Sequence, residues 1–232
     1  MPGRMEAAMS EIDPSRWEIV APADANREHL SLAHDEAYIA RVAEDGPRYA
    51  MAILAAGGAL AAARIAYDGE PAFACIRPPG HHASRAEGWG YCSFNNLVIA
   101  LFELRRKVGI ESAFVIDIDQ HTGDGTRKLL SSWPRAIVFN PFAENAREYL
   151  EIVESRLDAI TDAKIIAVSA GFDGYKLDLG HKLDTEDYRT IGSLIKTVSE
   201  RVCAGRRFAV LEGGYYLPDL GKNLRAFCEG FE

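Results

Sequence analysis

Five short apolar runs, each rich in β-branched or aromatic residues, recur along the chain. Runs of this length and composition are typical of strands buried in a parallel sheet. They cover residues 72–76, 113–118, 136–139, 165–169 and 208–211.

Segments in which apolar residues have helical spacing lie between and before these runs. Ser93 and Thr185 are candidate N-caps, and Gly109 and Gly205 are candidate helix stops. The predicted helices cover residues 93–108, 145–160, 185–203, 24–44 and 49–67, the last two separated by the turn Asp45-Gly46-Pro47. Strands that alternate with helices predict an α/β fold with three αβα layers and a mainly parallel central sheet.

Length and composition are those of one globular domain. The 232 residues are 48% hydrophobic and 26% charged, which allows a full core. We assign residues 17–232 to a single domain, with residues 1–16 as an N-terminal extension that need not be ordered and a short tail after Tyr216. The net charge is −8 without a run of five like charges, so we expect no nucleic-acid partner, and a cationic substrate suits the field better.

The cysteines and the apolar stretches bear on location. Four scattered cysteines form no Cys-x-x-Cys pair, which favours a reducing cytoplasm over a disulfide framework. The N-terminus has no apolar stretch of signal-peptide length. The most apolar segment, 49–67, is interrupted by Arg64 and indicates a buried helix rather than a membrane span. We therefore expect a cytoplasmic protein without a membrane partner.

Polar residues follow four of the five apolar runs directly. Because the carboxyl ends of parallel strands share one edge of a sheet, these clusters should meet there. The clusters are Arg77-Pro78-Pro79-Gly80-His81-His82, Asp117-Ile118-Asp119-Gln120-His121, Ala170-Gly171-Phe172-Asp173 and Glu212-Gly213-Gly214-Tyr215.

The second cluster has the spacing of a metal site. Asp117, Asp119 and His121 alternate, so in an extended chain they point to the same face. Two of them can bind a metal while the third accepts a hydrogen bond from a neighbouring imidazole. Asp173 is the candidate third protein ligand, which leaves one position for water or substrate.

The tandem histidines His81 and His82 are poor core residues, because buried imidazoles need hydrogen-bond partners. Asp117 and Asp124 are candidate partners. Asp124 lies in Gly123-Asp124-Gly125-Thr126, for which a turn with a helix cap is an equally good interpretation.

These clusters carry a resemblance to a known family. The chain resembles the histone deacetylase family of the arginase/deacetylase superfamily, especially its class II and bacterial members, from about Trp17 to the C-terminus. The matching blocks are Arg-Pro-Pro-Gly-His-His-Ala (77–83), Gly-Tyr-Cys-Ser-Phe-Asn-Asn (90–96), Asp-Ile-Asp-Gln-His-Thr-Gly-Asp-Gly-Thr (117–126), Ser-Ala-Gly-Phe-Asp (169–173) and Leu-Glu-Gly-Gly-Tyr (211–215).

The resemblance implies a zinc-dependent hydrolase of acylated amines with a reduced arginase/deacetylase fold. Asp119, His121 and Asp173 would bind one zinc ion. His82 would act as general base and acid, with Asp124 orienting it. His81 would be an electrostatic partner held by Asp117.

The resemblance also implies the substrate contacts. Tyr215 would donate its hydroxyl to the substrate carbonyl, the carbonyl of Gly90 would accept the substrate amide proton, and Tyr91 would line the acyl-lysine channel. A potassium ion near Asp117, Asp119 and His121 is a further implied cofactor.

The chain departs from the family pattern mainly by deletion. Thr122 replaces a second histidine, and no proline follows Asp178. We find no counterpart of the N-terminal strand and His-Pro-Glu loop in residues 1–16, and the connection after Phe139 is short. These deletions predict an open approach to the metal and a broad tolerance of acyl chains, or walls supplied by a second copy in a homo-oligomer.

Other conspicuous residues have structural interpretations. We expect His34 and Tyr38 to pack between helices and His29 to be exposed, whereas His181 could reach the rim of the site. Cys92 lacks a dedicated base. Trp89 is either a rim aromatic or a packing residue.

Three other functions stay open. The expected substrate is acylated lysine in a protein or peptide, but an acetylpolyamine amidohydrolase would use the same chemistry on a small acylated amine. An arginase-like hydrolase would need additional carboxylates for a second metal. A metal-stabilised domain that only binds acyl-lysine or a partner would need neither His82 nor Tyr215.

Overall fold

The protein is built around a five-stranded parallel sheet. The computed structural model describes residues 2–232, and in this part of the chain the strands are arranged in the order β1-β5-β4-β2-β3. All their pairings are parallel, which confirms the predicted α/β class. The strands are β1 (Ala72–Ala74), β2 (Ala113–Asp117), β3 (Ala136–Phe139), β4 (Ile166–Ala170) and β5 (Arg207–Leu211).

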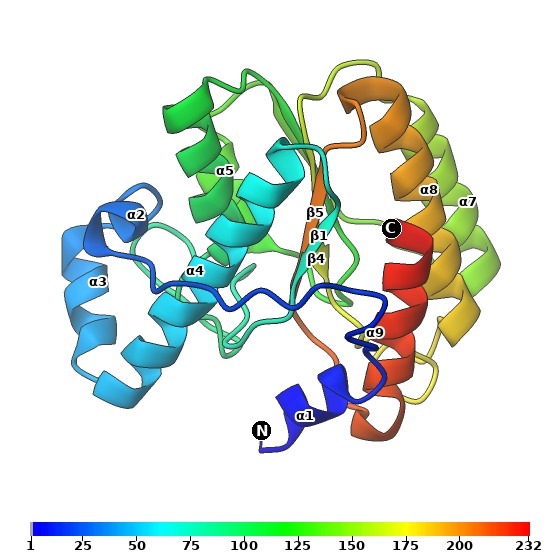
Figure 1. Cartoon of the computed structure of the whole chain (residues 1–232), viewed down its shortest axis with the longest axis horizontal. Coiled ribbons are helices and arrows are strands. Elements are labelled where there is room, and N and C mark those ends of the chain that lie inside the picture. The colour runs from blue at the N-terminus through cyan, green and yellow to red at the C-terminus, as the bar shows by residue number, and fades with distance from the viewer. Residues whose placement is uncertain (1) are drawn as a thin grey trace.

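Helices cover both faces of the sheet and complete the three layers (Figure 1). Along β2, Val115 joins the core shared with α4 (Gly46–Tyr67), α5 (Asn96–Val108) and α6 (Asp124–Leu130). Its neighbours Phe114 and Ile116 join the core shared with α7 (Ala146–Asp158), α8 (Thr185–Cys203) and α9 (Leu217–Phe231). This alternation is that of a strand buried on both faces.

Two of the predicted helix caps were misplaced by one or two residues. Asn95, not Ser93, caps α5 by accepting the backbone N–H of Val98, whereas the Ser93 hydroxyl accepts Arg48 Nε. Asp184, not Thr185, caps α8 and accepts the backbone N–H groups of Glu186 and Asp187. Both replacements are themselves good N-cap residues. The stop of α5 at Gly109, with φ +70°, is as predicted.

The predicted helix over residues 24–44 is divided into α2 (Arg27–Ser31) and α3 (Glu36–Ala43). The division has a cause at His34, which is buried between them. Its Nδ1 lies 2.8 Å from the carbonyl oxygen of Ser84, and its Nε2 accepts the backbone N–H of Asn95. These long-range hydrogen bonds hold the chain out of the helical path, so His34 is structural, as expected.

Helix α4 begins at Gly46 rather than at residue 49, with Asp45 as its cap. It is the one helix among residues 2–232 that is long and apolar enough to cross a membrane, with a mean hydropathy of 1.6 over its most apolar window. In the structure it packs against α5, β1 and β5, and small residues such as Gly57 form its buried side. A Cβ on Gly57 would overlap the carbonyl oxygen of Ala23, so residues 22–25 rest directly on the helix backbone.

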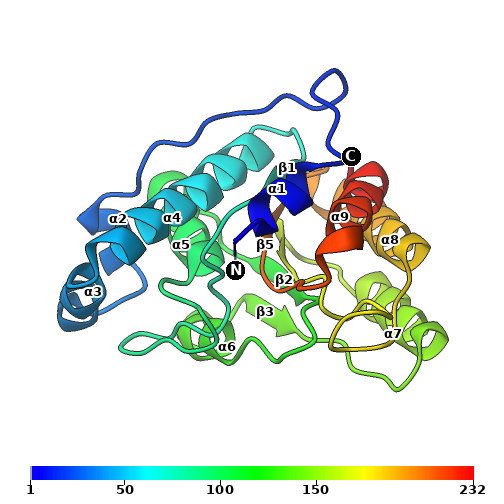
Figure 2. The same ribbon diagram turned by 90° about the horizontal axis from the view of Figure 1, so that it is seen from below.

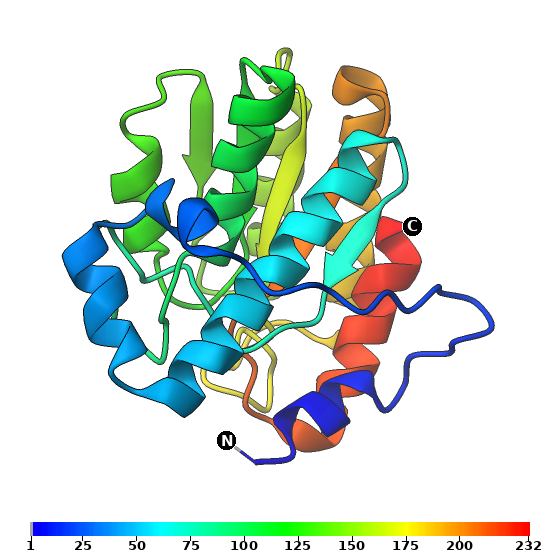
Figure 3. The ribbon, with the colours of Figure 1, turned by 60° about the vertical axis from the view of Figure 1, so that its left-hand side comes forward.

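The two ends of the chain are more structured than we predicted. The stretch after Tyr216, treated as a tail, forms the 15-residue helix α9. The segment treated as an extension contains α1 (Arg4–Met9), which packs on α9 with Ala8 fully buried (Figure 2). From α1 the chain crosses the outside of β1 and α4 to reach α2 (Figure 3), and the backbone N–H of Ala25 donates to the carbonyl of Ile53 on the way.

Candidate metal centre and active site

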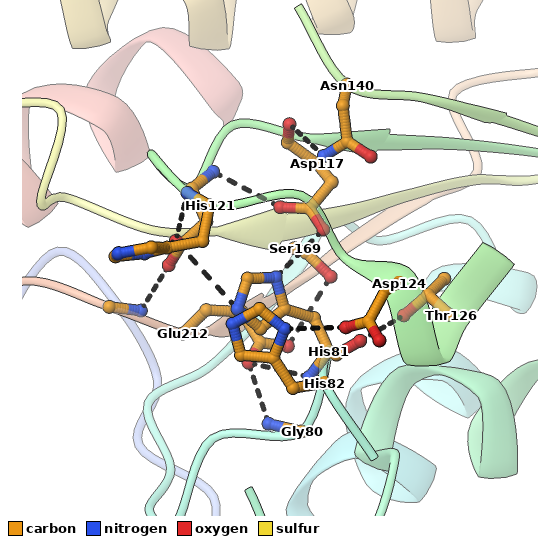
Figure 4. A network of polar contacts seen from close by, with 12 residues as sticks. Gly80, His81, His82, Asp117, His121, Asp124, Thr126, Asn140, Ser169 and Glu212 are labelled. Atoms are coloured by element: carbon orange, nitrogen blue, oxygen red, sulfur yellow. Dashed lines mark hydrogen bonds and ion pairs between the residues drawn. The ribbon is translucent and has the colours of Figure 1, made fainter. Parts of the chain in front are cut away.

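The polar clusters meet at the point in the sheet where successive strands of the chain are added on opposite sides of β2. From β2 the chain proceeds to β3 at one edge of the sheet, and then returns to β4 on the other side of β2. Open parallel sheets bind ligands at such a switch point, beyond the carboxyl ends of the strands. The loops after β2 and β4 carry Asp119, His121 and Asp173. Figure 4 shows His121 beside the network of polar contacts formed by His81, His82 and their carboxylate partners.

Asp119, His121 and Asp173 converge on one point. His121 Nδ1 lies 2.9 Å from Asp119 Oδ1 and 3.0 Å from Asp173 Oδ2. Both carboxylates are buried, whereas the His121 side chain is 43% exposed toward the cavity. Four-coordinate zinc with bonds of ~2.0 Å separates its ligand atoms by roughly 3.3 Å, so the spacing is within a few tenths of an ångström of that needed.

The surroundings of the three residues fit a bound cation. The buried Asp173 Oδ2 has no hydrogen-bond donor, because the single Nδ1 proton of His121 is directed to Asp119. The two carboxylates close to the ring, Asp119 first and then Asp173, raise the pKa of His121 to about 10. The same negative field attracts a metal ion, and one imidazole with two carboxylates suits zinc or ferrous iron.

His81 is held behind the metal ligands by Asp117. Its Nδ1 lies 3.0 Å from Asp117 Oδ2, and Asp117 is fully buried at the end of β2. Burial disfavours the imidazolium, but Asp117 outweighs it and raises the pKa of His81 well above the usual value. The carbonyl of Asp117, one of the residues near which the resemblance implies a potassium ion, accepts a hydrogen bond from Asn140 Nδ2 at 3.2 Å.

His82 lies in front of His81 and faces the cavity. Its Nδ1 donates to Asp124 Oδ1 at 2.8 Å, so Nε2 is the nitrogen left free to accept a proton. Burial, and then the nearby charge of His81, lower the pKa of His82. The ring is therefore neutral at neutral pH, as a general base must be. Asp124 is the first residue of α6, but the N-cap position is Gly123 and no side chain caps this helix, so the predicted cap role of Asp124 was wrong and its carboxylate bonds to His82 instead.

Tyr215 reaches the cavity from the loop after β5. Burial, and then the charges of Asp119 and Asp173, raise the pKa of Tyr215, which keeps its hydroxyl protonated. Asp178 Oδ2 accepts the backbone N–H groups of Tyr215 at 2.5 Å and Tyr216 at 2.7 Å. Gly213 precedes this turn because a Cβ there would lie 2.5 Å from Asp119 Oδ2.

Three supporting residues were not predicted to have a role: Arg4, Asp178 and Glu212. Arg4, in α1, is buried and donates to the carbonyls of Glu212 and Gly214. Glu212 Oε2 accepts the backbone N–H groups of Gly80 and His81, which ties β5 to the histidine loop. The position of Glu212 directly after a buried strand could have indicated a role in the site. The sequence around Arg4 gives no such indication.

Glu212 also belongs to a second cluster of potential ligands, with His81 and Cys92. Burial raises the pKa of Glu212 to about 7 and raises that of the Cys92 thiol above its usual range. A protonated thiol is a poor ligand, and the other two groups already bond to the protein. This cluster is therefore structural.

A cavity of about 360 Å³ opens over the site. The predicted Gly90 and Tyr91 are among its lining residues, and Tyr91 is 79% exposed at the mouth. His181 is not brought to the cavity, since it is exposed and its Nδ1 lies 3.2 Å from the carbonyl oxygen of Lys176. The lining residues are Pro79, His81, His82, Trp89, Gly90, Tyr91, His121, Leu179, Gly213 and Tyr215.

Comparison with known proteins agrees with this arrangement. The family model described as the histone deacetylase domain matches residues 1–149 and 141–231. The match begins at residue 1, so it extends further toward the N-terminus than the resemblance that we traced from about Trp17. Residues 2–16 contain α1 and no strand, in agreement with the prediction that the family's N-terminal strand is missing from this segment.

Individual relatives are named as deacetylases. The chain is 32% identical over 221 residues to a probable deacetylase of Methanothermobacter thermautotrophicus, covering 79% of this chain and 65% of the relative. It is 33% identical over 193 residues to type-2 histone deacetylase 2 of Dictyostelium discoideum, covering 62% of this chain and 11% of the relative. It is 26% identical over 265 residues to human polyamine deacetylase HDAC10, covering 86% of this chain and 39% of the relative. The chain thus spans less than two thirds of the length of each.

A solved structure shares the fold. The HDA15 HD domain aligns with 98% of this chain and 83% of its own, with a TM-score of 0.84 and 20% sequence identity. Together with the parallel sheet, this places the chain in the arginase/deacetylase fold. Because the family model matches nearly the whole of this chain, the chain belongs to the histone deacetylase domain family.

Proposed function

We propose that the chain is a zinc-dependent hydrolase of N-acylated amines, with acyl-lysine in a protein or peptide as its substrate. The observation that carries this proposal is the convergence of three functions in one cavity. His121 of the Asp119-His121-Asp173 triad, the neutral base His82 and the protonated Tyr215 all line the same 360 Å³ cavity, and Asp119 and Asp173 lie directly behind His121.

The triad supplies the metal site of the proposed reaction. When bound there, zinc would act as a Lewis acid on the amide carbonyl and lower the pKa of its water toward ~7. His82 accepts the proton of the attacking water at Nε2, because Asp124 occupies Nδ1. It later returns this proton to the leaving amine.

Tyr215 stabilises the charge that develops on the carbonyl oxygen. Its raised pKa keeps the hydroxyl a donor throughout the neutral range. Asp178 holds the backbone of this residue, so the donor is positioned before the substrate arrives. Such prior orientation makes an oxyanion donor effective in a site shielded from water.

A direct assay tests the proposal. The purified chain is loaded with one equivalent of zinc and incubated with acetyl-lysine and longer acyl-lysine peptides, and released amine is measured. We expect turnover that EDTA abolishes and added zinc restores. Absence of turnover with every acyl group, in a folded and zinc-loaded protein, would refute the proposed activity.

Replacing Tyr215 by phenylalanine is expected to lower kcat by about a hundredfold, because one oxyanion donor is lost. The aromatic ring remains to fill the same space. Zinc content should stay at the wild-type level, since Tyr215 is not among the three converging ligands. Steady-state kinetics and metal analysis give both values. Activity near that of the wild type would remove Tyr215 from the mechanism.

Acyl-chain selectivity is expected to be weak. Trp89, Tyr91 and Leu179 at the mouth of the cavity are all more than half exposed, so few walls surround the substrate. One methylene in a closed apolar pocket changes specificity by ~10–200-fold. We expect kcat/KM for acetyl-, butyryl- and octanoyl-lysine peptides to differ by less than ~10-fold. A strong preference for acetyl alone would contradict an open channel.

An acetylated polyamine is the second candidate substrate. The net charge of −8 and the similarity to a protein named polyamine deacetylase favour it. A comparison of kcat/KM between an acetylated polyamine and an acetyl-lysine peptide, at low and high salt, separates the two. Attraction of a small polycation by the protein field would weaken as ionic strength rises.

A further inference from the structure

The indole of Trp89 covers the outer face of the proposed general base. Its ring lies 3.6 Å from the ring of His82 between centroids, at an interplanar angle of 25°, so the two rings are stacked. The indole is nevertheless 53% exposed at the mouth of the cavity. Core packing does not explain why an exposed tryptophan is stacked on the imidazole of His82, the proposed general base.

The same indole contacts the carboxylate that orients His82. Trp89 Nε1 donates to Asp124 Oδ2 at 3.4 Å, while His82 Nδ1 donates to Asp124 Oδ1 at 2.8 Å. One carboxylate thus bridges the two stacked rings. Lys128 Nζ, 3.5 Å from the same Oδ2, is the other neighbour of this oxygen. The carboxylate cannot rotate freely without breaking one of these contacts.

The backbone is shaped to place the indole there. The backbone N–H of Cys92 donates to the carbonyl of Trp89, closing a tight turn in which Gly90 and Tyr91 have φ of +57° and +68°. Positive φ at both central positions is typical of a type I′ turn and is unfavourable for tyrosine. A Cβ on Gly90 would lie 2.7 Å from His82 Cδ2. The turn therefore packs directly against the imidazole.

We propose that Trp89 is a positioning residue for His82, an inference that rests on the proposed function. Stacking fixes the plane of the imidazole and the indole N–H fixes the carboxylate, so Nε2 is directed into the cavity. The indole face also lies against the imidazolium that forms when His82 takes the proton, and a cation is favoured over an aromatic face.

Two substitutions separate the contributions of the ring and the N–H. Trp89→Phe keeps an aromatic face and loses the donor, whereas Trp89→Leu loses both. We expect kcat to fall about tenfold in Trp89→Leu, the size of one stacked aromatic pair, and about threefold in Trp89→Phe, with KM changed less than kcat. Trp17→Leu, which removes an indole bonded to Glu232, is the matched control and should leave both constants unchanged. An unchanged kcat with a raised KM would make Trp89 a substrate contact only and overturn the proposal.

A measurement independent of turnover separates this inference from the proposed function. Histidine-selective labelling allows the ring protons of His82 to be followed by NMR, with His82→Ala identifying the signal. Stacking predicts an upfield ring-current shift that persists in Trp89→Phe and disappears in Trp89→Leu. The same His82 shift in the wild type and Trp89→Leu would refute the positioning role, even if the protein deacylates acyl-lysine. A lost shift in a protein without deacylase activity would support the placement while refuting the proposed function.

Discussion

Replacing His82 by alanine is expected to lower kcat by about 10²–10⁴-fold, the range for loss of a general acid–base group. The zinc content should not change, because His82 bonds to Asp124 and gives no atom to the converging triad. Steady-state kinetics with metal analysis on the same preparations measure both. If wild type and variant hydrolyse acyl-lysine equally, His82 is not the base.

The dependence of kcat/KM on pH tests the same role of His82 as a general base. His82 is active when neutral, so activity rises with pH through its pKa and is lost as the imidazole protonates at lower pH. Because burial and the charge of His81 lower this pKa, the acid limb of kcat/KM should lie below the ordinary value of ~6.5. The limb should vanish in His82→Ala. If neither the wild type nor His82→Ala hydrolyses acyl-lysine but both bind it, the chain is a metal-stabilised binding domain and not an enzyme.

Replacing His121 by alanine is expected to abolish zinc binding and, with it, deacylation. Loss of a residue that merely supports a ligand costs ~10–100-fold in metal affinity, so loss of the ligand should cost at least about a hundredfold. The half-exposed ring contacts the two carboxylates and faces the cavity, so the fold should survive. Calorimetric titration of the metal-free protein with Zn²⁺ measures the affinity, and circular dichroism checks the fold.

The matched control removes a histidine that lies outside the cavity. His181→Asn should bind zinc as the wild type does; asparagine tolerates the positive φ of 48° at this position. An unchanged zinc affinity in His121→Ala would remove this residue from the metal site. If the wild-type protein binds two Zn²⁺ ions per chain in this titration, the arginase-like two-metal chemistry is favoured instead.

The sheet and the residues around the metal were predictable because local patterns determine them. Each strand lies in a short apolar run with branched or aromatic residues, and the proposed metal ligands Asp119, His121 and Asp173 follow two of these runs within a few positions. Helix α9 carries an equally clear signal, with Leu220, Leu224, Phe227 and Phe231 on one buried side after Leu217-Pro218. We nevertheless expected only a short tail after Tyr216.

The supporting contacts were not predictable, because each joins residues that are distant in sequence. Asp178 binds the backbone of Tyr215 across 37 positions, and Arg4 reaches Gly214 across 210. No spacing rule relates such pairs. The same applies to the break at His34, whose partners Ser84 and Asn95 lie on the far side of α4 in the sequence.

The contact of Arg4 with the Tyr215 loop gives the start of the chain a mechanical connection to the reacting atoms. Helix α1 is short and is secured by Ala8 and by this one guanidinium. We expect a bulky tag fused ahead of Gly3 to displace α1 and, through the hydrogen bonds of Arg4, the loop that carries Tyr215. Recombinant material for kinetic work should therefore carry its tag after Glu232, at the end of α9 opposite to the loop that holds Tyr215.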